Sequence, residues 1–228
     1  YKRQPIFYAV QKNINIQTGQ PTILDFDMQR ISQRINIVFN IRTEGNIKRE
    51  DLAAPIIELS GACGRFNIAD ACLDTTRLYR MAHQVQPDEF TQTGEGTYRC
   101  VVHFHTLGVI PSAAKGHLNG PGILQVALQV STPQLDSSGA PVVDEEGNPV
   151  KNSRYIYGAI NPYDELTAAQ LIEVRDGKIY LRYSKEDVNI EITTPLVIKA
   201  DQIVPNDTGM GWQPHDPTNP DDDIIIEI

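Results

Sequence analysis

The sequence has few basic residues, few cysteines, a single tryptophan and no long apolar stretch. Its 20 lysines and arginines are outnumbered by 29 aspartates and glutamates, so the formal net charge is −9. Binding to nucleic-acid phosphates or to an anionic membrane surface requires a basic face, and this composition argues against both. No apolar run approaches the roughly 20 residues that a membrane-crossing helix needs. The 228 residues are ample for a hydrophobic core without metals or disulfides.

The only cysteines are Cys63, Cys72 and Cys100. They form no Cys-x-x-Cys motif, which argues against a structural zinc site and against a thioredoxin-like redox site. Free cysteines are among the most often buried residues, so three buried thiols are one interpretation. One disulfide with one free thiol is the other, and the spacing does not choose between them.

Apolar and polar residues alternate with a period of two in six segments of the chain. A β-strand turns successive side chains to opposite faces, so each segment predicts a strand with one buried and one solvated face. Such alternation is typical of antiparallel sheets that are covered on one side. The six segments are residues 24–28, 35–41, 98–104, 124–130, 179–183 and 188–192.

Turn signals separate these predicted strands. The Asp-Gly pair within Arg175–Lys178 predicts a tight hairpin. The polar, turn-rich stretch 137–149 predicts a protruding loop between strands at 123–131 and 154–158. Few helices accompany so many short strands, which is typical of an antiparallel β-sandwich in the all-β class.

Helix signals occur in two places only. Good helix formers over Asp164–Val174 predict one short helix, with Asp164 as its capping residue. Residues Lys48–Ala54 predict a single turn that ends before Pro55. The β-sandwich is therefore expected to carry at most one or two short helices.

His103 and His105 lie two residues apart in one predicted strand, so their side chains project from the same face. They could share a zinc ion if His83 or His117 supplied a third ligand. Two histidines on the solvated face of a strand are more common, and no third ligand has a recognisable spacing. We therefore predict no metal and no other cofactor. The chain also lacks a serine-nucleophile motif and a phosphate-binding loop, and we predict that it is not an enzyme.

Tyrosines are frequent in and near the predicted strands of the second half of the chain. They could form a platform on which sugar rings stack. Tyrosines on strands are more often half-buried packing residues whose hydroxyl groups reach water. The residues concerned are Tyr155, Tyr157, Tyr163, Tyr180 and Tyr183.

An apolar, β-branched run ends the sequence. It follows Asp221–Asp223 and consists of Ile224, Ile225, Ile226 and Ile228, with Glu227 among them. Such a run is prone to edge-to-edge aggregation in water, so it must pair with a sheet edge in its own chain or in a neighbouring one. Because alternate isoleucines would face the same way, the run is a candidate donor strand for β-augmentation.

Short segments along the chain occur in an order that is found in a known family. The most telling are Glu58-Leu59-Ser60-Gly61-Ala62 and Thr106-Leu107-Gly108, preceded by the strand patterns of Ile6–Gln11 and Thr22–Met28. In this order the chain resembles the fimbrillin-like proteins of Gram-negative anaerobes, in a branch described as a domain of unknown function. The resemblance extends from about Ile6 to Ile228.

The resemblance implies two transthyretin-like β-sandwich domains in a full-length protein. Residues 1–28 would be the end of an N-terminal domain and a connector, and residues 29–228 a C-terminal sandwich with a hairpin insertion near 133–153. It also implies export to the outer membrane or cell surface. Attachment to the membrane would be only through a lipidated cysteine, which we do not identify in this chain. Members of the family build or anchor fimbriae, and their shafts polymerise by strand donation.

We therefore expect an exported structural or adhesion protein, either a fimbrial subunit or a fimbrial anchor or accessory protein. Its expected partners are other fimbrial subunits or copies of itself, held by strand pairing, and a host or glycan ligand. Two alternative functions stay open. One is a carbohydrate-binding surface module, and the other is a metal-dependent hydrolase that uses His103 and His105.

Overall fold

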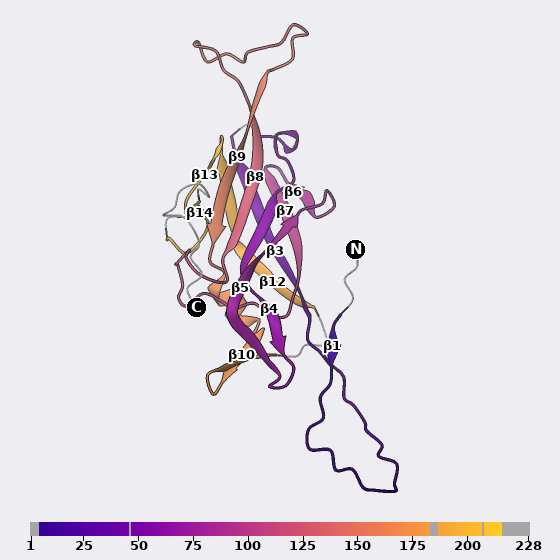
Figure 1. The fold of residues 1–228 in the computed structure, drawn as a ribbon. Helices are drawn as coiled ribbons and strands as arrows, with labels where there is room; N and C mark the ends of the chain where they lie inside the picture. Colours follow the sequence, from indigo (N-terminus) through magenta and orange to yellow (C-terminus); the bar gives the residue numbers. More distant parts are fainter. Residues whose placement is uncertain (1–4, 46, 183–186, 207, 216–228) are drawn as a thin grey trace.

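Two β-sheets packed face to face form the body of the protein (Figure 1). The structure is a computed structural model, and it describes residues 5–45, 47–182, 187–206 and 208–215. Helix within these residues is limited to the 3-10 turn η1 (Arg49–Asp51) and the short helix α1 (Tyr163–Ala168). The prediction of an all-β sandwich with at most one or two short helices is confirmed. In the described ranges no helix is long and apolar enough to cross a membrane.

Among the described residues, the larger sheet has the strand order β10-β11-β5-β4-β8-β9-β14 and the smaller sheet the order β13-β12-β3-β7-β6. The strands of the larger sheet are β4 (Ile56–Asn67), β5 (Cys72–Gln84), β8 (Leu124–Pro133), β9 (Lys151–Ile160), β10 (Ile172–Arg175), β11 (Lys178–Leu181) and β14 (Gln213–Pro214). Those of the smaller sheet are β3 (Gln33–Glu44), β6 (Phe90–Gly94), β7 (Thr97–Thr106), β12 (Val188–Lys199) and β13 (Gln202–Ile203). A separate ribbon consists of β1 (Phe7–Tyr8) and β2 (Gln29–Arg30).

One strand pair differs from the antiparallel rule that the alternation predicted. β12 runs parallel to β3, from Val188 beside Ile35 to Lys199 beside Glu44. The other pairs between described strands are antiparallel. Alternation specifies which face of a strand is buried, and either direction of the neighbouring strand satisfies it. The residues of β12 therefore contain no pattern that predicts the direction in which it runs relative to β3.

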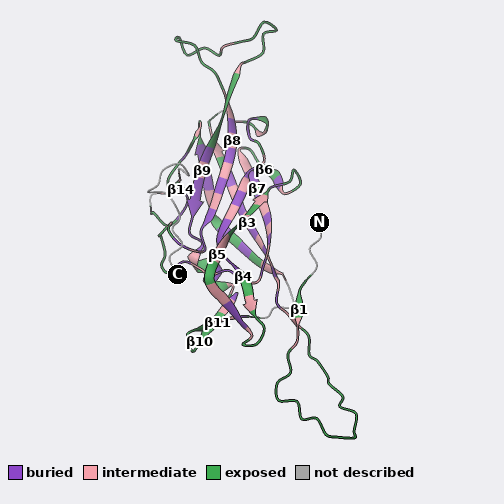
Figure 2. Ribbon diagram, in the orientation of Figure 1, coloured by how far each residue is buried: buried purple, intermediate pink, exposed green. Residues whose placement is uncertain are grey.

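The core lies between the two sheets and is built from the apolar faces of the alternating strands. Figure 2 shows buried and half-buried residues alternating along β3, β7 and β8. Each buried side chain is removed from water by its own sheet and by the one opposite, which is the main favourable term in folding. The residues these strands contribute include Ile35, Ile37, Phe39, Ile41, Tyr98, Cys100, Val102, Phe104, Leu124, Val126, Leu128 and Val130.

A bulge in β4 at Ser60 and Gly61 holds the loop that precedes β8. Ser60 is buried, and its Oγ accepts a hydrogen bond from the N–H of Ile123 at 2.9 Å. Gly61 has φ +83°, and a Cβ there would lie 2.6 Å from the carbonyl oxygen of Ile110 and from the backbone nitrogen of Gly122. This close approach has room only for glycine. The Ser-Gly pair in the segment on which the resemblance rests therefore has a packing role.

The turn predicted at Arg175–Lys178 is confirmed as the tight connection between β10 and β11. Arg175 pairs with Lys178, and the two residues between them have positive φ angles, 50° at Asp176 and 71° at Gly177. Two consecutive residues with positive φ twist a two-residue loop in the sense that antiparallel strands require.

The connection from β8 to β9 extends away from the sandwich at the end opposite to β10 (Figure 1). It contains two turns of the same kind, which begin at Asp136 and Asp144. The Oδ1 atom of Asp136 accepts the N–H groups of Ser138 and Ala140, and that of Asp144 accepts those of Glu146 and Asn148. These hydrogen bonds favour the ionised carboxylates and lower the pKa of both aspartates.

The strand predicted at residues 24–28 does not form. Residues 9–28 are a long exposed loop between β1 and β2, and Ile23, Phe26 and Met28 are all exposed. Residues 8–11 and 25–27 line one hollow, but the β1–β2 ladder ends where Tyr8 pairs with Gln29. A strand needs hydrogen bonds from a neighbour, and no described strand pairs with residues 24–28. The assignment of residues 1–28 to the end of a preceding domain stays a prediction.

The helix predicted over Asp164–Val174 is shorter than expected. It ends after Ala168, because Gln170 adopts φ +50° and Ile172 pairs with Leu181 in the β10–β11 hairpin. Asp164 is not the cap, since Pro162 occupies that position. The Asp164 carboxylate instead pairs with Lys115 at 2.6 Å. The turn predicted before Pro55 is present as η1.

Candidate functional site

The main hollow of functional interest runs between β5 of the larger sheet and β7 of the smaller one. β11 pairs with β5 only where Ile179 meets Leu73, and β6 pairs with β7 only as far as Cys100. The hydrogen-bonded ladder between β11 and β5 and the one between β6 and β7 therefore each leave part of the longer strand unpaired on that side by any described strand. The stretches beyond them, residues 75–84 of β5 and 102–106 of β7, contribute the lining of two adjoining cavities. We call the two together the groove.

The groove has an apolar end and a charged end. The apolar cavity has a volume of about 270 Å³ and is lined by residues that include Ala62, Cys63, Tyr79, Met81 and Leu107. The charged cavity has a volume of about 870 Å³ and is lined by residues that include Arg30, Arg34, Arg80, His83, His103 and Asp187. Met81 and His105 line both cavities, so the two adjoin. An extended peptide could contact both environments at once.

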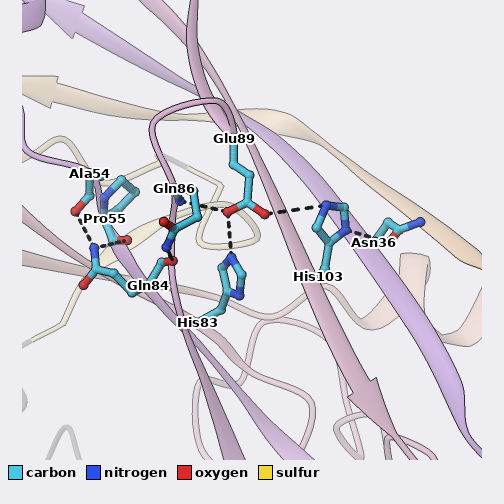
Figure 3. Close-up of polar contacts among 8 residues, drawn as sticks. All are labelled: Asn36, Ala54, Pro55, His83, Gln84, Gln86, Glu89 and His103. Atoms are coloured by element: carbon cyan, nitrogen blue, oxygen red, sulfur yellow. Dashed lines mark hydrogen bonds and ion pairs between the residues drawn. The ribbon is translucent and has the colours of Figure 1, made fainter. Parts of the chain in front are cut away.

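Glu89 joins two histidines beside the charged end, as Figure 3 shows. Its Oε2 atom lies 2.8 Å from Nε2 of His83 and accepts the N–H of Gln86 at 2.8 Å. Its Oε1 atom lies 3.7 Å from Nε2 of His103. Burial opposes ionisation of Glu89, but the hydrogen bonds from Gln86 and His83 and the nearby histidines outweigh burial and lower its pKa. Glu89 is therefore a carboxylate.

His103 is held on its other side by Asn36 of β3. Its Nδ1 atom lies 2.7 Å from Oδ1 of Asn36, and Nδ2 of Asn36 donates to Oδ1 of Asn189. Because an amide oxygen only accepts, Nδ1 of His103 is the donor, which leaves Nε2 unprotonated in the neutral ring. Burial, followed by the charge of Arg34, lowers the pKa of His103, although Glu89 acts in the opposite direction.

The two histidines singled out by their spacing do share a face of β7. The residues beside them on β3 are Asn36 opposite His103 and Arg34 opposite His105. The ring of His83 lies 6.5 Å from that of His103 between centroids, whereas His117 lines a different cavity. Among the described residues, no three His, Cys, Asp or Glu side chains are placed to hold a metal ion.

The cysteines are three buried, free thiols. Burial, with a smaller contribution from Asp74, raises the pKa of Cys63 to about 11. Burial, with a smaller contribution from Glu89, raises that of Cys100 to about 12. Thiols with such high pKa values are poor nucleophiles, so the interpretation as buried small hydrophobic residues is confirmed and the disulfide alternative is wrong.

The tyrosines do not form one platform. Tyr155 and Tyr157 stack on β9, with ring centroids 6.2 Å apart and an interplanar angle of 24°. Tyr180 lies on β11, separated from β9 by β5, β4 and β8, and packs against Arg175. Tyr163 belongs to α1, and Tyr183 lies outside the described residues. Of the five tyrosines, only the two on β9 are described as stacked on each other.

The candidate donor strand, Ile224–Ile228, also lies outside the described residues. The described chain ends just after β14, where Trp212 is buried and its Nε1–H donates to the carbonyl oxygen of Thr194 at 3.0 Å. β14 is an edge of the larger sheet, with β9, β8 and β4 between it and β5.

Sequence reasoning missed Glu89 and the arginines of the groove. Glu89 lies in the connection between β5 and β6, and nothing in its local spacing marks it. Arg34 carried a weak signal, because it occupies the solvated face of β3 in the same alternation that predicted the strand. Its position opposite His105 required knowing that β3 pairs with β7.

Comparison of the chain with protein-family models, with curated proteins and with solved structures gives no significant match.

Proposed function

We propose that this protein is a non-enzymatic structural or adhesion protein of the cell surface, a fimbrial subunit or a fimbrial anchor or accessory protein that assembles by strand addition. The observation that carries the proposal is the groove along β5 and β7. An added strand gains main-chain hydrogen bonds from a sheet edge and specificity from pockets that receive alternate side chains.

The sequence supplies a matching donor. Ile224, Ile226 and Ile228 would face one way on an extended strand, which suits the apolar end of the groove near Met81 and Leu107. Neighbouring strands lie about 4.8 Å apart, so the four steps from β14 to β5 amount to about 19 Å of sheet. Because an extended chain of the eight residues 216–223 reaches about 26 Å, this separation permits both donation to another copy and pairing within the chain. Repeated head-to-tail donation builds a filament when the rotation between copies does not close a ring.

The proposal is tested by removing residues 221–228 and measuring self-association by size-exclusion chromatography, together with a melting curve. We expect the full chain to associate with increasing concentration and the shortened chain to be monomeric with an unchanged melting temperature. A shortened chain that associates as before but melts at lower temperature would show that the run completes its own sheet, and would overturn the proposal.

Substitutions within the terminal run test the identity of its residues without changing the length of the chain. Replacing Ile224, Ile226 and Ile228 by serine should abolish association, whereas replacing Ile225 alone, on the opposite face, should preserve it. Mixing Met81→Cys protein with Ile226→Cys protein under mild oxidation should give a disulfide-linked dimer. Both proteins carry Cys63→Ala, because Cys63 lines the same cavity as Met81, and the other two native cysteines are buried.

A carbohydrate-binding surface module is the second candidate. The stacked pair Tyr155 and Tyr157 favours it, because Tyr155 is 51% exposed and sugar rings stack on exposed aromatic faces.

A further inference from the structure

The charged end of the groove concentrates positive charge on a chain that is otherwise acidic. Three arginines line this cavity against one aspartate, and Glu89 adds a second carboxylate beside His83 and His103. The chain as a whole has a formal net charge of −9. Clefts that gather charge of one sign attract ligands of the opposite sign. The cavity is therefore suited to an anionic ligand.

Arg30 and Arg34 have hydrogen-bonding capacity to spare. Asp187 lies between them, but its carboxylate oxygens are 3.9 Å from Nη2 of Arg30 and 3.4 Å from Nη1 of Arg34, both long for charge-assisted hydrogen bonds. The Nε atoms of Arg30 and Arg34 are buried without a hydrogen-bond partner. Their side chains are 23% and 37% exposed, so both guanidinium groups remain accessible from the cavity.

The chemistry of an arginine pair selects carboxylates. A guanidinium group presents a planar fork of N–H donors that matches a carboxylate with two parallel hydrogen bonds. The adjoining cavity is apolar, so the best ligand carries carboxylates next to a short apolar strand. Within this sequence that order occurs where Asp221–Asp223 precede Ile224–Ile228. In an extended chain Asp222 faces the same way as Ile224, Ile226 and Ile228, about 7 Å from Ile224, whereas Asp221 and Asp223 face the other way.

We propose that Arg30 and Arg34 form a carboxylate receptor that binds Asp222 of a second copy and so sets the register of the entering strand. This inference rests on the proposed strand addition. A strand that shifts by one residue turns its other face to the groove. A charged contact beside the isoleucines therefore fixes which face of the strand enters the groove. The apolar end of the groove buries the isoleucines of the entering strand, and the arginine end fixes the register of that strand.

The test measures binding of synthetic peptides to protein shortened by residues 221–228, using calorimetry at low and high salt. The probes are the 219–228 peptide, the same peptide with its three aspartates replaced by asparagine, and the acidic 219–223 fragment. We expect the asparagine peptide to bind about tenfold more weakly at low salt, and this ratio to shrink at about 0.5 M salt because exposed ion pairs are screened.

On the protein side, Arg30→Gln with Arg34→Gln should remove most of the discrimination between the two long peptides. The matched control is Arg154→Gln, which alters an exposed arginine of β9 that pairs with Asp201. Equal binding of both long peptides would overturn the receptor and leave strand addition standing. Binding of the acidic fragment alone would support the receptor and count against strand addition. Failure of all three peptides would overturn both. The peptide comparison remains decisive if the double variant does not fold.

Discussion

Trp212 is the residue that fastens the last described segment of the chain to the core, and replacing it tests that role directly. It is 1% exposed, and its ring lies 5.2 Å from that of Phe39 between centroids. Its indole N–H donates to the carbonyl oxygen of Thr194 in β12. Its own carbonyl oxygen accepts the N–H of Asn206 at 2.9 Å. Trp212 therefore anchors the last described segment of the chain, which precedes the candidate donor strand in sequence, to the smaller sheet.

The expected magnitudes follow from area and hydrogen bonding. A buried tryptophan removes roughly 200 Å² from water at about 25 cal/mol per Å², which is about 5 kcal/mol. Trp212→Ala should therefore lower the free energy of unfolding by about 3–5 kcal/mol, including the cavity that remains. Trp212→Phe keeps most of the apolar area but leaves the Thr194 carbonyl without its donor, for a cost of about 1–3 kcal/mol.

Urea unfolding followed by circular dichroism measures both variants, since fluorescence is lost with the only tryptophan. The midpoints should fall in the order wild type, Trp212→Phe, Trp212→Ala, with little change in the slope of free energy against urea. A cost below about 1 kcal/mol for Trp212→Ala would refute the reasoning, because it would mean that the segment is not anchored through this ring.

Two further predictions concern pH and glycan binding. Because the folded-state pKa of His103 lies below its ordinary value of 6.5, the unfolded chain takes up this proton first, and stability should fall as the pH drops below about 6.5. Glu89, whose pKa is below 4.5, should add a further loss as the pH falls below about 4.5. The groups that act on His103 are Arg34, Glu89, His83 and Asp187, and His103→Gln should flatten the upper part of a plot of melting temperature against pH. If the protein binds a glycan through β9, Tyr155→Ala with Tyr157→Ala should weaken binding by about tenfold on a glycan array, whereas Tyr180→Ala should not. Equal weakening by Tyr180→Ala would argue against a site on β9.

Strand positions and faces were predictable because they depend on neighbours in sequence. The alternation along β3, β7 and β8 reports which side of each strand is apolar, and the Asp-Gly turn at 176–177 depends on two residues alone. The stretch 24–28 has the same alternation and forms no strand, because the pattern supplies no partner. The helix before β10 ends early for the related reason that Ile172 has a partner in Leu181.

The sequence by itself determined the all-β class, the buried faces of most strands, the burial of the cysteines as one of two choices, and the shared face of His103 and His105. Only the tertiary structure decided that β12 runs parallel to β3, that Glu89 lies between His83 and His103, and that Arg30 and Arg34 meet at the end of an apolar groove. The physical reason is the range of the interactions. Side-chain periodicity is a property of a few consecutive residues, whereas strand order and direction are set by the packing of two whole sheets, and the groove exists only after that packing.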